Sequence, residues 1–211
     1  MSLHKYTTFF WDFDGVILDS NAVREFGFKK VLERFSEEQI NQLLSFHRSN
    51  GGLSRYVKFR FFYEEILGES VSEDQIKVLA EAFSKIMMQE LIKPEYLIAE
   101  TVDYIKEKAK KVPMYIVSGS DQNELRYLCQ ELGLASFFKG IYGSPIPKIQ
   151  LVQTILEKNT TIVPSLSCLI GDSHNDWEAA QKNGLDFVGY NNEELIEKGK
   201  YYVNSFKNEH K

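Results

Sequence analysis

Short apolar runs alternate with longer amphipathic segments over most of the chain. The first run, residues 7–11, is β-branched and aromatic and stops at an Asp-rich loop, which predicts a buried strand. Further strands are predicted over residues 114–117, 140–142, 167–170 and 186–189, with an edge strand over 201–203. Helices are predicted over residues 95–111, 121–132, 148–158, 175–183 and 193–198. This alternation predicts an α/β fold with a doubly wound, Rossmann-like parallel sheet covered by helices on both faces.

A long helical segment interrupts the alternation, because residues 20–93 contain no strand-like run. Helical patterns occupy residues 22–35, a segment starting at Ser36, residues 54–67, and residues 72–88 with Ser72 as N-cap. One crossover helix would suffice to connect two parallel strands, so four helices indicate an inserted domain. We therefore expect a core of residues 1–18 and 94–211, and an inserted helical domain of residues 19–93.

Composition narrows the class of protein. The 211 residues are 43% hydrophobic and 26% charged, which is typical of a soluble globular protein. A net charge of −5 provides no basic excess for binding nucleic acid. No run approaches the ~18 apolar residues of a membrane span, and the polar first eight residues lack the apolar region of a signal peptide. We expect no nucleic-acid or membrane partner, and no pattern in the sequence sets an oligomeric state.

The two cysteines, Cys129 and Cys168, are not in a C-x-x-C spacing and indicate neither a zinc site nor a disulfide framework. We interpret them as structural thiols in a reducing compartment, and expect a cytoplasmic protein.

Four polar clusters lie at the carboxyl ends of predicted strands, where open α/β sheets bind ligands. They are Asp12-Phe-Asp14-Gly-Val, Ser118-Gly119-Ser-Asp, Lys148, and Gly171-Asp172-Ser-His-Asn-Asp176. Each cluster alone has a structural explanation, since Asp and Gly form turns, Ser and Asp cap helices, and most lysines are surface residues. Their common location at strand ends favours a single site.

In this order, the clusters resemble the four motifs of the haloacid dehalogenase superfamily, and the helical insertion is similar to the cap that follows its first motif. The resemblance covers the whole chain and is to the branch of phosphoglycolate phosphatase and β-phosphoglucomutase. It implies a Mg²⁺-dependent phosphatase that acts through an aspartyl-phosphate. A cap over the site disfavours macromolecules, so we expect a small phosphorylated metabolite, either a sugar phosphate or a phosphorylated acid.

The resemblance also implies catalytic roles. Asp12 would be the nucleophile, and Asp14 would be the general acid for the leaving oxygen and then the base for water. Ser118 and the amide of Gly119 would hold the phosphoryl oxygens. Lys148 would offset charge between nucleophile and phosphate.

The same resemblance implies the metal ligands. Mg²⁺ would be held by the carboxylate of Asp12, the backbone carbonyl of Asp14, and Asp172. Asp176 would lie close by, either binding the metal or orienting Lys148 or a metal-bound water.

Two arginines of the insertion are candidates for recognising the leaving group. The segment 47–55 joins two predicted helices and contains Arg48, two adjacent glycines and Arg55. Arginine suits anionic or polyhydroxylated ligands, and the equivalent loop of the resembled branch contacts the leaving group. The alternative is an ordinary turn with solvated charges. The aromatic side chains that follow are expected to pack the core of the insertion: Phe59, Phe61, Phe62 and Tyr63.

Other functions stay open. A phosphosugar mutase of the β-phosphoglucomutase type is the main alternative, although the mutase pattern has Glu-Asp where this chain has Gly171-Asp172. Dehalogenases proper lack the acid at the position of Asp14 and need no metal. Phosphonate hydrolysis needs a cap lysine, for which Lys29, Lys30 and Lys58 are available, but helices commonly carry exposed lysines. A non-catalytic binding protein is disfavoured because every catalytic position is filled.

Overall fold

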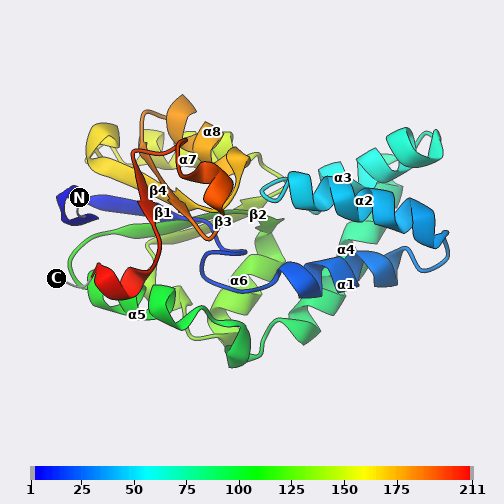
Figure 1. Ribbon diagram of the computed structural model, residues 1–211, viewed down its shortest axis with the longest axis horizontal. Coiled ribbons are helices and arrows are strands. Elements are labelled where there is room, and N and C mark those ends of the chain that lie inside the picture. Colours follow the sequence, from blue (N-terminus) through cyan, green and yellow to red (C-terminus); the bar gives the residue numbers. More distant parts are fainter. Residues whose placement is uncertain (1–2, 210–211) are drawn as a thin grey trace.

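The computed structural model describes residues 3–209, and its centre is a six-stranded parallel sheet with helices on both faces (Figure 1). The strands lie in the order β3-β2-β1-β4-β5-β6. This is the doubly wound Rossmann order, so the predicted α/β fold class is confirmed. The strand bounds are β1 (Thr8–Trp11), β2 (Met114–Asp121), β3 (Gly140–Ser144), β4 (Ser167–Gly171), β5 (Asp186–Tyr190) and β6 (Tyr201–Val203).

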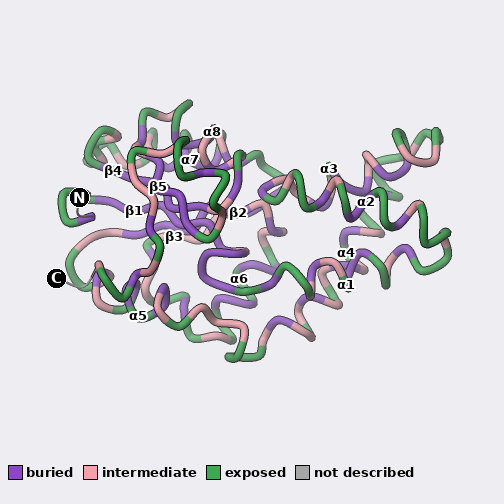
Figure 2. The backbone as a smooth tube through the Cα atoms, viewed as in Figure 1, coloured by how far each residue is buried: buried purple, intermediate pink, exposed green. Residues whose placement is uncertain are grey.

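Each face of the sheet has its own hydrophobic core, because successive residues of β1 point to opposite faces. Phe10 packs in the core that includes residues of α7 (Lys148–Lys158) and α8 (His174–Lys182). Phe9 and Trp11 pack on the other face against Tyr104 of α5 (Ala99–Lys108), next to α6 (Gln122–Glu131). Burial on both faces explains why β1 reads as a continuous apolar run. Figure 2 shows these central strands as the most continuously buried part of the chain.

The central strand β1 pairs with β2 on one side and β4 on the other. Trp11 lies in register with Ile116 of β2 and Ile170 of β4. The strand order reverses between β1 and β4, and such a reversal opens a crevice beyond the carboxyl ends of the two strands. Asp12 and Asp172 follow these two strands directly, so both carboxylates are placed at the crevice.

Between β1 and β2 the chain forms a helical lobe, defined here as α1 (Asn21–Val31), α2 (Glu37–Ser49), α3 (Arg55–Phe61) and α4 (Glu73–Glu90). The lobe extends away from the sheet, to the right in Figure 1. Capping boxes at Ser36 and Ser72 begin α2 and α4, which confirms the predicted helix start at Ser36 and the predicted N-cap Ser72.

Aromatic side chains fill the interior of the lobe. Phe28 packs against Phe59 and Phe83. The aromatic residues that were expected to pack do so, since Phe59, Phe62 and Tyr63 are buried and Phe61 stacks on Phe46.

The chain enters and leaves the lobe side by side. Leu18 and Leu97 form an antiparallel bridge, and the amide of Ile98 donates to the carbonyl of Ile17 at 3.0 Å. The expected core segments end at 18 and resume at 94, close to this neck. Residues 1–2 and 210–211 of those segments lie outside the described residues.

Three predicted helices are wrong in part. The segment 54–67 is α3 followed by a π-helix, Phe62–Leu67. The segment 95–111 contains a 3₁₀ helix, Pro94–Tyr96, and α5 begins only at Ala99, because Leu97 and Ile98 are extended where they pair with the neck. The segment 193–198 forms only a 3₁₀ helix, Glu193–Leu195. Among the described residues, no helix combines the length and apolar character needed to cross a membrane.

Candidate active site

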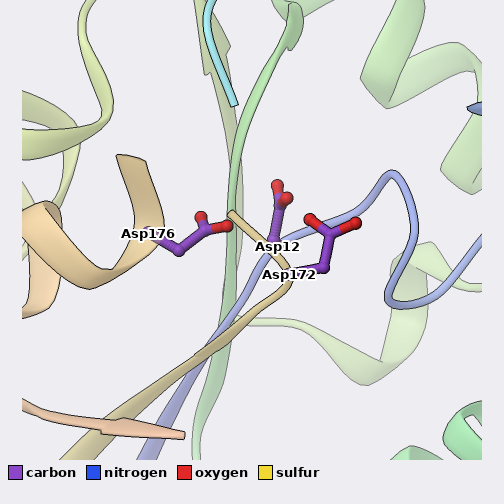
Figure 3. Close-up of side chains that lie close together, drawn as sticks. All are labelled: Asp12, Asp172 and Asp176. Carbon is purple, nitrogen blue, oxygen red and sulfur yellow. The ribbon is translucent and has the colours of Figure 1, made fainter. Parts of the chain in front are cut away.

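Three carboxylates meet at the crevice between β1 and β4 (Figure 3). Asp12, Asp172 and Asp176 each place an oxygen within 4.8 Å of the others. Asp12 follows β1, Asp172 follows β4, and Asp176 lies in the first turn of α8. Clustered carboxylate oxygens are the donors that Mg²⁺ prefers, so this set fits a magnesium ion.

The electrostatics of the crevice favour a cation. Burial, and next the carboxylate of Asp176, raise the pKa of Asp12 to about 7. Burial and the carboxylate of Asp12 raise the pKa of Asp172. Both shifts reflect negative charges held together away from water. A bound divalent cation would offset that charge.

Lys148 is the cation that the chain itself supplies to this cluster. It begins α7 and is buried, and its Nζ lies 2.8 Å from Asp12 Oδ1 and also contacts Asp176 Oδ1. Burial opposes the charged form, but the carboxylates of Asp12 and Asp176 raise the pKa of Lys148 above its ordinary value. The N-terminus of a helix disfavours a cation because of the helix dipole, and these two carboxylate contacts explain why a lysine is nevertheless found there. One lysine offsets only part of the charge of three carboxylates.

The local backbone positions the cluster. Ser173 caps α8, and its amide and hydroxyl both donate to Asp176 Oδ2, at 3.0 and 2.6 Å. Asp176 is thereby oriented with its other oxygen against Lys148. Gly15 has φ +75, and a Cβ there would lie 2.0 Å from Asp172 Oδ2, so any other residue at this turn would be strained and would displace the Asp172 carboxylate.

Asp14 belongs to a second polar network. Its Oδ1 accepts hydrogen bonds from Ser20 Oγ and from Arg24 Nε, the latter at 3.0 Å. Its Oδ2 accepts from Ser120 Oγ and from Arg24 Nη2, the latter at 3.2 Å. Burial would raise the pKa of Asp14, but the Arg24 guanidinium and these hydroxyls lower it below its ordinary value. In this arrangement Asp14 is ionised, which is the form that accepts a proton.

A buried glutamate connects this network to the helical lobe. Glu124, on α6 of the core, pairs with Arg24 of α1 and with Arg55 of α3. Arg55 also donates to Ser84 Oγ at 2.7 Å and lies over the ring of Phe83. Neither Arg24 nor Glu124 was predicted from the sequence as a site residue. The available signal was the position of Glu124 on the same helical face as Leu128, four residues later and fully buried.

We expect Glu124→Gln to lower the free energy of unfolding by about 3–5 kcal/mol, because it leaves two buried guanidinium groups without their common carboxylate. Urea denaturation measures the change. Glu131→Gln is the matched control, since Glu131 is exposed on the same helix, and it should shift the free energy by no more than about 0.5 kcal/mol. Equal effects of the two changes would show that the buried ion pairs do not stabilise the fold.

Between the lobe and the core lies a cavity of about 50 Å³ beside the carboxylates, called here the inner cavity. Asp12, Asp14, Asp172 and residues 118–120 line it from the core side. From the lobe side it is lined by Arg24, Phe28, His47, Arg55, Lys58, Phe83 and residues 51–53. All of the predicted site residues of the core line the inner cavity except Lys148 and Asp176. Lys148 contacts Asp12 directly, and Asp176 contacts Lys148.

The predicted phosphate-binding residues lie at the end of β2. Ser118 Oγ accepts from the amide of Ser120 at 3.0 Å, and both residues line the inner cavity with Gly119. A Cβ on Gly119 would lie 2.4 Å from the carbonyl oxygen of Gly52, so glycine allows the lobe to approach this strand. The same Gly52 carbonyl accepts from Asn175 Nδ2 at 2.8 Å, which holds the lobe loop against α8.

The two predicted arginines of the lobe have different environments. Arg48 is exposed and pairs with Glu25 through two hydrogen bonds of 2.7 and 2.8 Å. It borders a larger outer cleft of about 580 Å³, which shares Asn21, His47, Gly51 and Asp172 with the inner cavity. Arg55 lines the inner cavity itself, but its guanidinium is already paired with Glu124.

Comparison with known proteins identifies the family. The model of the haloacid dehalogenase-like hydrolase family matches residues 9–190. The chain belongs to this family. The suspected superfamily is therefore confirmed, and the protein is an enzyme of a hydrolase family. None of the curated proteins compared with the chain matches it in sequence.

Solved structures share the fold of this haloacid dehalogenase-like hydrolase at low identity. A predicted phosphatase from Clostridium acetobutylicum is 20% identical with a TM-score of 0.75, over 96% of this chain and 95% of the other. β-Phosphoglucomutase from Clostridium difficile is 20% identical with a TM-score of 0.74, over 96% and 92%. The HAD-hydrolase YfnB from Bacillus subtilis, whose structure contains magnesium, is 19% identical with a TM-score of 0.72, over 96% of both chains.

Proposed function

We propose that this hydrolase is a Mg²⁺-dependent phosphatase of small phosphorylated metabolites, with Asp12 as its nucleophile. The observation that carries the proposal is the meeting of Asp12, Asp172 and Asp176 with Lys148 beside the inner cavity, whose wall includes Asp12 and Asp172. A carboxylate can attack an anionic phosphoryl group only where positive charge offsets the repulsion. The crevice supplies Lys148 and a donor set that fits a divalent cation.

The metal would be held by the carboxylates of Asp12 and Asp172 and by the backbone carbonyl of Asp14. When bound, Mg²⁺ offsets the charge of the phosphoryl group and the nucleophile. The contacts of Asp176 with Ser173 and Lys148 support an orienting role for this side chain.

The chain's own residues account for both halves of the reaction. An oxygen of Asp12 forms a bond to phosphorus while the bond from phosphorus to the ester oxygen breaks, and Asp14 gives that oxygen a proton. Ser118 and the Gly119 amide bind the phosphoryl oxygens. Asp14 then takes a proton from water, the resulting hydroxide attacks phosphorus, and the bond to Asp12 breaks. Before the first step, Asp14 must release Arg24 and take up a proton from solvent, and this is the proton that it gives to the ester oxygen.

The small volume of the inner cavity supports a small substrate. Its roof is the helical lobe, which is tied to the core by Glu124 and by the hydrogen bond from Tyr56 Oη to Asp121 Oδ2 at 2.8 Å. We propose that the lobe, residues 19–93, acts as a cap that admits metabolites and excludes macromolecules. Arg48 at the outer cleft and Arg55 at the inner cavity stay proposed contacts of the leaving group, although each must exchange a carboxylate partner to reach it.

Hydrolysis is favoured over mutase chemistry by the position before Asp172. A Cβ on Gly171 would lie 2.3 Å from Asp176 Cβ, so the glutamate of the mutase pattern has no room here while Asp176 keeps its place.

The two cysteines are free and buried, which supports the proposed cytoplasmic location.

Release of inorganic phosphate from a panel of phosphorylated sugars and acids, with Mg²⁺ present, tests the proposal. A phosphatase releases phosphate from some member of the panel. A mutase instead converts a phosphosugar into its isomer with little free phosphate, and turnover of neither kind would contradict the proposed chemistry.

A further inference from the structure

The helical lobe places a buried lysine at the inner cavity without a carboxylate partner. Lys58, on α3, is 3% exposed and lines the cavity together with Asp12 and Asp14. Its Nζ contacts His47 Nδ1 at 2.7 Å and the Gly51 carbonyl oxygen at 3.2 Å. Within residues 3–209, no carboxylate oxygen lies within 4.0 Å of this ammonium group. Buried lysines are rare unless paired, so this one requires an explanation.

The other cations at or beside the cavity each have a carboxylate in direct contact. Arg24 and Arg55 are matched by Asp14 and Glu124. Lys148 is paired with Asp12 and Asp176. Lys58 therefore adds a positive charge on the lobe side of the cavity. Among the described residues, no carboxylate contacts it directly.

The immediate partners of Lys58 leave it able to bind a ligand. Burial, and next the charge of Lys58, lower the pKa of His47 to about 3, so this imidazole is neutral and its Nδ1 accepts from the lysine. An ammonium group has three donors, of which His47 and Gly51 engage two. Burial lowers the pKa of Lys58 itself to about 7, and a bound anion would restore the charged form.

We propose that Lys58 binds an anionic group on the leaving half of the substrate, so that the preferred substrate is a phosphomonoester whose alcohol carries a carboxylate. This inference rests on the proposed phosphatase function and narrows its substrate class. The phosphoryl group lies against the core residues, and the carboxylate lies against the lobe. One unmatched positive charge and a small cavity fit a singly charged carboxylate better than a second phosphate.

The two predicted arginines are less suited to this role. The guanidinium of Arg55 is engaged by Glu124 and Ser84, and Arg48 is exposed and pairs with Glu25 outside the inner cavity. Lys58 was not predicted from the sequence as a site residue, because helices commonly carry exposed lysines. Only the packing of α3 against the core shows that this lysine is buried at the site.

The test compares two esters that differ in one group, 3-phosphoglycerate and glycerol 3-phosphate. Wild-type enzyme with Mg²⁺ should favour the carboxylate ester by at least about tenfold in kcat/KM. Lys58→Met keeps the length of the side chain and removes the charge. It should lose about 10- to 100-fold on 3-phosphoglycerate and less than about twofold on glycerol 3-phosphate. Lys85→Met is the matched control, since Lys85 is an exposed lysine of the lobe, and it should change neither value.

Inhibition of p-nitrophenyl phosphate hydrolysis by each ester is also measured. This inhibition reports how tightly each ester binds, whether or not the ester itself is hydrolysed. Urea denaturation checks that Lys58→Met folds, and Lys58→Gln replaces it if it does not. Equal losses on both esters, or no preference by the wild type, would overturn the role of Lys58. Failure of the wild type to hydrolyse any ester, p-nitrophenyl phosphate included, would instead overturn the proposed phosphatase function.

Discussion

Asp12→Asn should reduce kcat by at least about a thousandfold while the protein keeps its fold. The amide has nearly the size of the carboxylate but lacks the negative charge that attacks phosphorus. The neighbouring Lys148 keeps its contact with Asp176, so the buried lysine stays paired and the crevice keeps its packing. Phosphate release under saturating substrate and Mg²⁺ measures the effect.

Asp19→Asn is the matched control for this prediction. Asp19 is an exposed aspartate seven residues further along the chain, at the neck of the lobe, where its backbone amide donates to the Tyr96 carbonyl. This variant should retain wild-type turnover. More than about one per cent of wild-type activity in Asp12→Asn would exclude Asp12 as the nucleophile.

Excess chelator should stop turnover, and Mg²⁺ should restore it in full. The reason is the charge at the crevice, where Lys148 faces the three carboxylates of Asp12, Asp172 and Asp176 and the substrate adds further negative charge. Ca²⁺ should substitute poorly, because it takes six to eight oxygens in looser geometry and allows both oxygens of Asp12 to bind it. Full activity in excess chelator would contradict the proposed metal dependence.

Binding of the metal is measurable apart from catalysis. At a hundred times its dissociation constant, Mg²⁺ should stabilise the fold by about 2.7 kcal/mol, seen as a rise in the unfolding midpoint. Asp172→Asn should remove most of that rise. Asp103→Asn, a change at an exposed residue of α5, should leave it intact. A rise that survives in Asp172→Asn would show that Mg²⁺ stabilises the protein elsewhere.

The core of the site was predictable because it depends on local patterns and one topological rule. Apolar runs mark the strands, and a parallel sheet brings their carboxyl ends to one edge. Asp12, Ser118, Lys148 and Asp172 each follow such a run or begin the next helix, so their convergence follows once the strands are assigned. The structure adds that Asp14 lies in a network with Arg24 and Ser120.

The helix boundaries show where local patterns fail. The predicted helix 95–111 was too long at its start because Leu97 and Ile98 have a helical pattern in the sequence but pair with residues 17–18 in the fold. This tertiary contact joins residues about 80 positions apart in the chain. It outweighs the local helix propensity, which is worth roughly tenths of a kcal/mol per residue. The same neck determines where the chain enters and leaves the lobe.

The sequence alone determined the order of strands and helices, the helical insertion and the acidic motifs at the strand ends. Each of these features depends on the spacing of apolar residues or on residues adjacent in the chain. Tertiary structure alone decided which charged side chains of the lobe are buried and with whom. Arg24 and Arg55 meet Glu124 across 100 and 69 residues, and Lys58 is buried beside His47 at the cavity wall. No spacing encodes such pairings, because they arise when the lobe packs against α6 and removes those side chains from water.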